Sequence, residues 1–327
     1  MKKSSLLKIL TGTLILVFGI VIAISITGSK KINDVVLATH DSFVMTKTQI
    51  AKFDHETGFN LRLIKAGDAG ALTNRLVLTK GAPIADAVFG IDNTLASLAT
   101  KSDLISGKLS ATDFGDVCLN YDKDWFAAHK IAPPLTLLSL INSNYKGLTV
   151  LENPKLSSPG LSFLAATVDE FGTEKWQAYW KALKANQVKI DNGWEAAYYT
   201  DFSGSSGKGK YPIVLSYSTS PADEVRSDGH SQTASIFDGC FKQTEYVGIL
   251  KGAKNPEGAK AVVKYLLSAE FQQTFPGAMY MYPILRSATV PSSWSKFANL
   301  PPKTFGDTLN FTANRKAWLD AWSAIFA

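Results

Sequence analysis

The segment Ile213-Val214-Leu215-Ser216-Tyr217-Ser218-Thr219-Ser220-Pro221 joins an apolar run to a group of hydroxyl side chains and a proline. The apolar run is typical of a buried strand. Serine before proline is typical of a helix start, because serine caps free amides and proline has no amide hydrogen to leave unpaired. A second segment repeats the pattern, since Thr149-Val150-Leu151 leads to Ser157-Ser158-Pro159-Gly160. Helix N-termini attract anions and polar groups, so the pair suggests a ligand held between two backbone corners, although capping alone explains either one.

The segment before residue 101 alternates between strands and helices. Short apolar runs predict strands at residues 34–39, 59–64 and 85–89. The spacing of apolar residues predicts helices at residues 46–56, 70–79 and 93–100, with Gly58 ending the first and Asp92 capping the last. This alternation is typical of an α/β lobe with a mostly parallel sheet.

The rest of the chain predicts a second α/β lobe. Strands are expected at residues 116–121, 188–190, 211–217 and 245–250, and helices at residues 137–141, 160–171, 174–184, 256–267 and 312–326. The chain is expected to cross between the lobes twice, near residues 112–121 and 225–247. We therefore assign residues 34–112 and 235–327 to the first lobe and residues 113–234 to the second.

The first 28 residues differ from the rest of the chain. Lys2, Lys3 and Lys8 precede an apolar stretch over residues 9–26. A charged front and an apolar middle are typical of an export signal, and the stretch is also long enough to span a bilayer if it is not removed. We expect residues 1–28 to be a signal peptide or an N-terminal membrane anchor. The body is then exported, to the periplasm or the outer face of the cytoplasmic membrane.

The composition is that of an ordinary globular protein, with 46% hydrophobic and 19% charged residues. The net charge is +6, and loss of the three leader lysines lowers it to +3. Because no dense stripe of lysine and arginine is present, nucleic acid is not expected as a partner. Outside the cytoplasm the two cysteines, Cys118 and Cys240, favour a disulfide, with two buried thiols as the alternative.

No catalytic motif is complete in this sequence. Residues 204–210 match the spacing of a phosphate-binding loop, but Tyr211 stands where Ser or Thr should bind magnesium, and a strand follows where a helix should. The four histidines are not spaced as metal ligands. We therefore expect a binding protein rather than an enzyme, with no metal and no cofactor.

Aromatic residues stand next to the predicted corners. Trp194 follows Gly193 at a predicted helix start, Tyr217 ends a predicted strand, and Tyr280 lies shortly before Pro283. Aromatic faces beside hydroxyls and carboxylates suit a flat cationic ligand, since each well-placed ring contributes about 0.5–2 kcal/mol of cation–π attraction. The alternative for each of these residues, taken singly, is an ordinary aromatic side chain of the core or the surface.

Through an ordered set of segments, the mature chain resembles the periplasmic thiamine-binding proteins of ABC transporters, which are two-lobed extracellular solute-binding proteins. The segments are residues 39–43, 72–76, 85–93, 116–123, 157–161, 193–198, 215–222 and 281–283. The most specific are Ser157-Ser158-Pro159-Gly160, Gly193-Trp194 and Tyr217-Ser218-Thr219-Ser220-Pro221. The resemblance implies an α/β, two-lobed periplasmic-binding-protein-like (type II) fold with two crossing hinge strands.

The resemblance also implies a thiamine site in the cleft between the lobes. Asp68 matches a position that lies on the ligand, and Ala69 stands where the family often has glycine. Ser157 and Ser158 match residues that bind the hydroxyethyl or phosphate end. The matching walls of the site are the aromatic residues Trp194, Tyr217 and Tyr280 and the polar strip of Ser218, Thr219 and Ser220. His40 occupies a position where relatives can have tyrosine.

We expect a protein that captures thiamine or thiamine phosphates and delivers them to an ABC permease. It is expected to be a monomer that meets the membrane only through its N-terminal segment. One alternative is a binding protein for ferric iron, a polyamine or a phosphonate. Another is an exported thiamine-degrading enzyme with Cys118 as its nucleophile. The stretch 104–114 looks shorter than in relatives, which is expected to trim the wall near Asp113 and Phe114.

Overall fold

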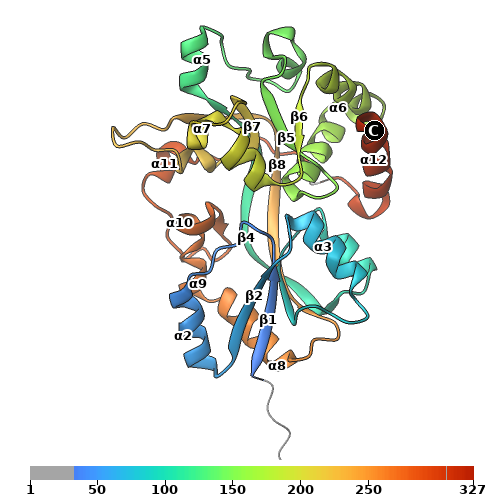
Figure 1. Ribbon diagram of the computed structural model, residues 1–327, viewed down its shortest axis with the longest axis vertical. Coiled ribbons are helices and arrows are strands. Elements are labelled where there is room, and N and C mark those ends of the chain that lie inside the picture. The colour runs from blue at the N-terminus through green and yellow to red at the C-terminus, as the bar shows by residue number, and fades with distance from the viewer. Residues whose placement is uncertain (1–32, 307) are drawn as a thin grey trace, which may run out of the picture. The chain divides into compact units, whose positions relative to one another are not determined.

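The computed structural model describes residues 33–306 and 308–327. The segment predicted to be a signal peptide or anchor, residues 1–28, lies outside the described residues. From residue 34 onward the described chain forms one unit, which is drawn in Figure 1. Within this described part, no helix combines the length and the apolar character needed to cross a bilayer.

One nine-stranded sheet runs through the two lobes in the order β2-β1-β3-β8-β4-β7-β5-β6, with β9 beside β4. The strands are β1 (Asp34–Thr39), β2 (Asn60–Lys65), β3 (Ala87–Asp92), β4 (Ile105–Asp122), β5 (Thr149–Glu152), β6 (Lys189–Asp191), β7 (Ile213–Tyr217), β8 (Thr233–Leu250) and β9 (Tyr282–Pro283). The strands β1, β2 and β3 are parallel, and so are β5, β6 and β7. The parallel sheet predicted from strand–helix alternation is therefore present in each lobe.

The antiparallel pair β4 and β8 crosses from one lobe to the other (Figure 1). Each strand has 18 residues and pairs along most of its length. The sequence predicted only their apolar parts, residues 116–121 and 245–250. In the remainder, polar and glycine residues interrupt the apolar ones, so no regular alternation indicates a strand there.

Helices cover the sheet in both lobes. The helices of more than one turn are α2 (Lys47–Thr57), α3 (Ala69–Leu78), α4 (Ala96–Lys101), α5 (Lys123–His129), α6 (Ser158–Ala185), α8 (Pro256–Leu266), α10 (Phe275–Met279) and α12 (Phe311–Phe326). The other helical segments are the π-helical η3 (Ala196–Asp201), the 3-10 turns η1 (Leu138–Ile141), η2 (Ser143–Tyr145) and η4 (Ser220–Ala222), and the four-residue helices α7 (Ser203–Ser206), α9 (Ala269–Gln272) and α11 (Trp294–Phe297). The two helices predicted at 160–171 and 174–184 are the halves of α6, which breaks at Gly172 with φ of 74°.

Two predicted helix starts differ from the structure. The helix expected at 93–100 begins only at Ala96, because Asp92 Oδ1 accepts the amides of Thr94 and Leu95 and holds a turn first. The corner at residues 218–221 opens only the three-residue 3-10 turn η4. Thr219 there has helical φ and ψ instead of the extended backbone that a capping residue needs. The corner at Ser157 is confirmed, since its hydroxyl accepts the Gly160 amide at 3.3 Å.

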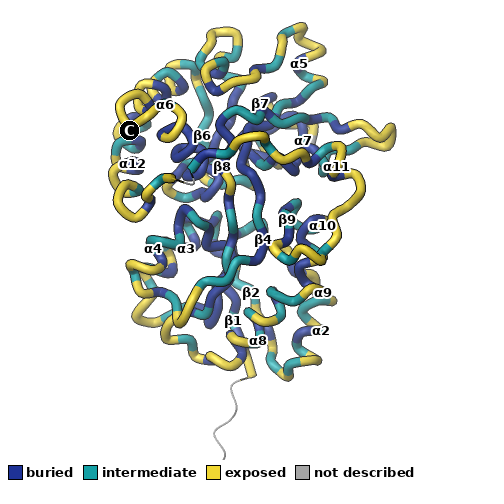
Figure 2. Tube along the Cα trace, turned by 180° about the vertical axis from the view of Figure 1, so that it is seen from behind, coloured by how far each residue is buried: buried dark blue, intermediate teal, exposed yellow. Residues whose placement is uncertain are grey.

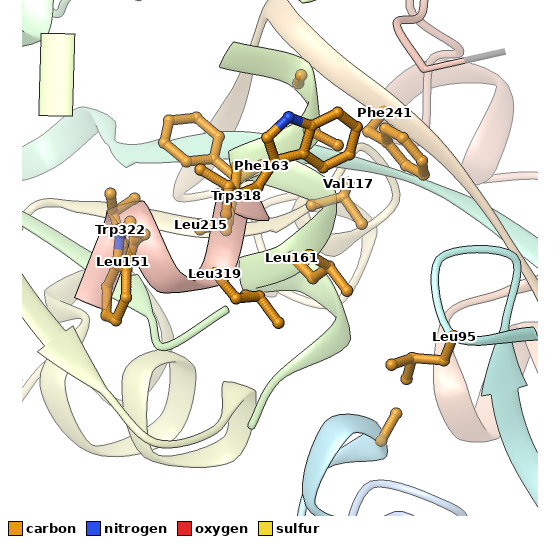
Figure 3. Packing of buried hydrophobic residues seen from close by; sticks show 14 of the residues in the cluster. Leu95, Val117, Leu151, Leu161, Phe163, Leu215, Phe241, Trp318, Leu319 and Trp322 are labelled. Carbon is orange, nitrogen blue, oxygen red and sulfur yellow. The ribbon is translucent and has the colours of Figure 1, made fainter. Parts of the chain in front are cut away.

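The apolar core of the second lobe includes the C-terminal helix. Buried and exposed residues alternate along the helices in Figure 2, and Figure 3 shows Trp318, Leu319 and Trp322 of α12 beside Leu161 and Phe163 of α6. The helices α12 and α6 are neighbours in space. The assignment of residues 235–327 to the first lobe is therefore wrong for α12, because its tryptophans complete the core of the second. The other lobe limits stay a prediction.

A disulfide joins Cys118 of β4 to Cys240 of β8, as the cysteine count favoured. Both residues are buried. They lie where the pairing of the two strands is interrupted, between Val117 and Leu119. Because its sulfur is bonded, Cys118 is not available as the nucleophile that the enzyme alternative required.

Candidate functional site

A cavity of about 230 Å³ lies between the two lobes. The first lobe lines it with His40, Ser42, Val44, Asp68, Glu245, Ala278, Met279, Tyr280 and Met281. The second lobe lines it with Ser158, Pro159, Trp194, Glu195, Tyr198, Tyr199, Tyr217, Ser220 and Asp223. Each lobe thus supplies one wall, so a ligand here contacts both.

His40 follows β1 and forms the floor on the side of the first lobe. Its side chain is 10% exposed, and Nε2 lies 3.2 Å from Glu245 Oε1. Gly90 of β3 makes room for the ring, because a Cβ at that position would stand 2.1 Å from His40 Cδ2. Burial lowers the pKa of His40, but Glu245 and then Asp68 and Asp41 outweigh it, so the pKa is raised.

Glu245 of β8 is held ionised by its neighbours. It stands opposite Asp113 of β4 in the register of the sheet, and Thr112 Oγ1 lies 2.8 Å from Asp113 Oδ2. Burial and the charge of Glu245 raise the pKa of Asp113 well above its usual range. Burial also acts to raise the pKa of Glu245, but the His40 charge and a hydrogen bond from Asp113 outweigh it and lower that pKa. The pair therefore favours the proton on Asp113 and the charge on Glu245.

Asp68 links the two lobes at the edge of the cavity. It caps α3, where Oδ1 accepts the Ala69 amide at 2.6 Å, and Oδ2 accepts the Trp194 amide of the other lobe at 2.9 Å. Burial raises the pKa of Asp68, although these two amides lower it. Close by, the Ala71 amide donates to Leu156 O at 2.9 Å, again between lobes.

Aromatic rings form the wall of the second lobe. Trp194 stacks on Tyr198 with ring centres 4.9 Å apart and meets Tyr199 and Tyr217 edge-on. The indole Nε1 donates to Ser216 Oγ at 2.8 Å, which fixes the ring. Tyr280 approaches from the opposite lobe in the left-handed region, with φ of 55°. Such a conformation is uncommon for tyrosine and is typical of binding sites.

A chain of side-chain amide and hydroxyl groups connects the two lobes beneath these rings. Gln243 Nε2 donates to Ser158 Oγ at 2.8 Å, and Tyr217 OH donates to Gln243 Oε1 at 3.0 Å. Ser220 Oγ accepts the Tyr217 amide at 3.2 Å. The N-terminus of α6 at Ser158 is thus fixed against the crossing strand β8.

The predicted site residues divide into two groups. Those that line the cavity are His40, Asp68, Ser158, Trp194, Tyr217, Ser220 and Tyr280. The others stand behind it: Ala69 and Ser157 serve at helix starts, and the hydroxyls of Ser218 and Thr219 are buried without a partner among the described residues. Whether any of them touches a ligand stays a prediction. Asp113 and Phe114 belong to the stretch 104–114, which looks shorter than in relatives. Neither residue lines the cavity.

Sequence reasoning missed several lining residues, above all Glu245 and Asp223. Glu245 lies in a predicted strand, where an acidic residue between apolar ones was the available signal. Asp223 directly follows the recognised corner at residues 217–222. Among the described residues that line the cavity, four are carboxylates, five are Trp or Tyr, and His40 is the basic one. The wall therefore suits a flat ligand with positive charge.

Comparison with known proteins gives the family. Residues 86–301 match the family model described as bacterial extracellular solute-binding protein. The thiamine-binding periplasmic protein of Escherichia coli K12 is 30% identical over 291 residues, covering 83% of this chain and 85% of the relative. The thiamine-binding periplasmic protein of Brucella melitensis is 28% identical over 340 residues, covering 98% of each chain.

Solved structures share the fold. A periplasmic thiamin binding protein superposes with a TM-score of 0.79 at 26% identity, covering 92% of this chain and 98% of that one. Iron-bound HitA from Pseudomonas aeruginosa has a TM-score of 0.71 at 17% identity, covering 90% and 99% of the two chains, which shows the fold alone. The predicted two-lobed fold is confirmed. With the cavity between its lobes, this chain belongs to the bacterial extracellular solute-binding proteins.

Proposed function

We propose that the cavity binds thiamine. One observation carries the proposal: the lining of a single cavity combines five aromatic side chains with four carboxylates. Thiamine is a flat aminopyrimidine joined to a cationic thiazolium ring, so its faces suit Trp194 and the tyrosines, and its charge suits the carboxylates. The thiamine-binding names of relatives that cover most of the chain support the same ligand.

Thiamine phosphates are the second predicted form of the ligand. Their phosphate would be received at the N-terminus of α6, where Ser158 lines the cavity and the helix dipole favours negative charge. No lysine or arginine is among the described residues that line the cavity. We therefore expect the diphosphate to bind less tightly than free thiamine, because its charge meets four carboxylates.

The proposed role is capture outside the cytoplasm and delivery to an ABC importer. The periplasmic relatives and the predicted export segment at residues 1–28 support this placement. Binding would close the lobes about β4 and β8, since a ligand that contacts both walls stabilises the closed form. We infer a monomeric binding protein rather than an enzyme. The bonded state of Cys118 argues against the enzyme alternative that depended on it.

Mass spectrometry of the native protein tests the ligand. The protein is expected to carry a molecule with the mass of thiamine or its monophosphate. Titration calorimetry of the ligand-free protein should then give tight binding of thiamine and far weaker binding of its neutral pyrimidine half. Co-purification of a different molecule, together with absent heat on thiamine addition, would reject the proposal.

A further inference from the structure

His40 is chemically out of place in a cavity for a cation. It is the one basic side chain among the described residues that line the cavity, whose other ionisable groups are carboxylates and tyrosines. The cavity is only about 230 Å³ in volume and His40 is 8% exposed. A protonated imidazole and a ligand cation would therefore lie close together with little water between them, where repulsion is strong.

The geometry around His40 favours a proton on its imidazole when the cavity holds no ligand. Its Nε2 lies 3.2 Å from the buried Glu245 Oε1. Other groups that face the imidazole are Asp41 on the same loop and Asp68 at the start of α3, while Asp113 of β4 acts through Glu245. The only ring packed against it is Phe89 of β3, at 5.7 Å, among the described residues. Burial lowers the pKa of His40, but Glu245 and the two aspartates outweigh burial and raise it.

We propose that entry of the ligand cation expels the proton of His40, so that capture is coupled to proton release and weakens in acid. The N–H bond at Nε2 breaks, its electron pair stays on nitrogen, and the proton passes to the buffer. The ligand cation then replaces the imidazolium as the positive charge facing Glu245 and Asp68. This inference rests on the proposed function, since it requires a positively charged ligand.

Calorimetry in several buffers measures the proton directly. Thiamine is titrated into the full-length protein at pH 6.5 in buffers of different ionisation enthalpy. The slope of observed heat against that enthalpy should correspond to release of about 0.5 to 1 proton per ligand. Between pH 8 and pH 6 the affinity should fall, approaching tenfold per pH unit at the acidic end. The neutral analogue 3-deazathiamine should release no proton.

Three variants locate the source of the proton. His40→Gln should abolish the release and flatten the pH profile. Glu245→Gln keeps the imidazole but removes the carboxylate that holds its proton, so it should reduce the release in the same way. His55→Gln alters an exposed histidine on α2 and should release as many protons as the wild type. Circular dichroism confirms that each variant is folded.

The outcomes separate this inference from the proposed function. Thiamine binding without any buffer dependence leaves the function standing and overturns the proton coupling. Equal release from His40→Gln and the wild type also overturns it, and shows that the proton comes from a group other than His40. Equal release with thiamine and its neutral analogue does so too, because the ligand charge then plays no part. Failure of the wild type to bind thiamine rejects both.

Discussion

At the residue scale, Trp194 is held in the site by three different contacts. Its ring stacks on Tyr198, its indole nitrogen donates to Ser216, and its amide donates to Asp68 of the other lobe. The sequence identified this tryptophan because its aromatic neighbours and Gly193 are local in the chain. It did not identify Glu245 or Gln243, whose places in the site depend on the pairing of β8 with β4.

Replacing Trp194 by alanine should weaken thiamine binding at least about tenfold, because the stacked ring face is lost. The half-buried side chain also packs on Tyr198 and the apolar cluster behind it, so the melting temperature should fall while the protein stays folded. Trp194→Phe keeps a ring without the bond to Ser216 and should lose less affinity. Calorimetry and thermal unfolding of both variants check this. An unaltered affinity in Trp194→Ala would show that the ring is not part of the binding wall.

Asp92 should make the protein more stable in mild acid. Burial raises its pKa to about 7, so the folded state favours the neutral acid and loses stability as the pH rises from the unfolded value of 3.8 through 7. Asp116 and Glu224, whose pKa values burial raises to about 6 and about 7, act in the same direction.

Asp92→Asn should remove about 2 kcal/mol of the decrease in unfolding free energy between pH 5 and pH 7.5. Asparagine keeps the oxygen that accepts the amides of Thr94 and Leu95, so the turn is retained. Urea unfolding of wild type and variant at the two pH values measures the difference. Parallel pH profiles for the two proteins would contradict the assignment.

At the element scale, sequence periodicity gave most helices and the lobe strands, because each has one apolar face against a single core. It predicted only residues 116–121 of β4 and 245–250 of β8, since polar and apolar residues are mixed in the rest of these two strands. Of the two paired acids, Glu245 lines the cavity and Asp113 is buried beside it. The corner at Ser220 predicted a helix start but opens only η4, because the Ser220 hydroxyl bonds to Ser216 and to the Tyr217 amide at the end of β7.

The disulfide between β4 and β8 should contribute strongly to stability. Cys118 and Cys240 are 122 residues apart, so the bond restricts the unfolded chain over a long loop, worth roughly 2–4 kcal/mol. The double variant Cys118→Ala/Cys240→Ala should unfold at a lower urea concentration than the oxidised wild type. Reductant should shift the unfolding of the wild type toward the variant and leave the variant unchanged. Equal urea midpoints for the variant and the oxidised wild type would argue against this contribution.

At the scale of the whole described unit, direct bonds between the lobes hold the cavity closed. Asp68 accepts the Trp194 amide, Ala71 donates to Leu156 O, and Gln243 donates to Ser158. Because these bonds join the two lobes, separating the lobes must break them. The lobes and their contacts therefore govern how long a ligand stays.

Asp68→Asn should speed dissociation of thiamine roughly tenfold with a smaller change in association, since most interface changes act on the off-rate. The amide can keep the bond to Ala69 but offers a donor or a neutral oxygen to the Trp194 amide. Stopped-flow tryptophan fluorescence, whose change should be lost in Trp194→Phe, measures both rates. Asn74→Ala, which removes a weaker exposed contact to Lys155, serves as the control. Unchanged dissociation would show that Asp68 does not restrain opening.

The packing of α12 on α6 also bears on how the polypeptide is made. The tryptophans of α12 leave the ribosome long after the helix that they cover, so a growing chain exposes the apolar face of α6 throughout that interval. Until α12 has been made, the core of the second lobe is incomplete and its apolar surface is open to chaperones.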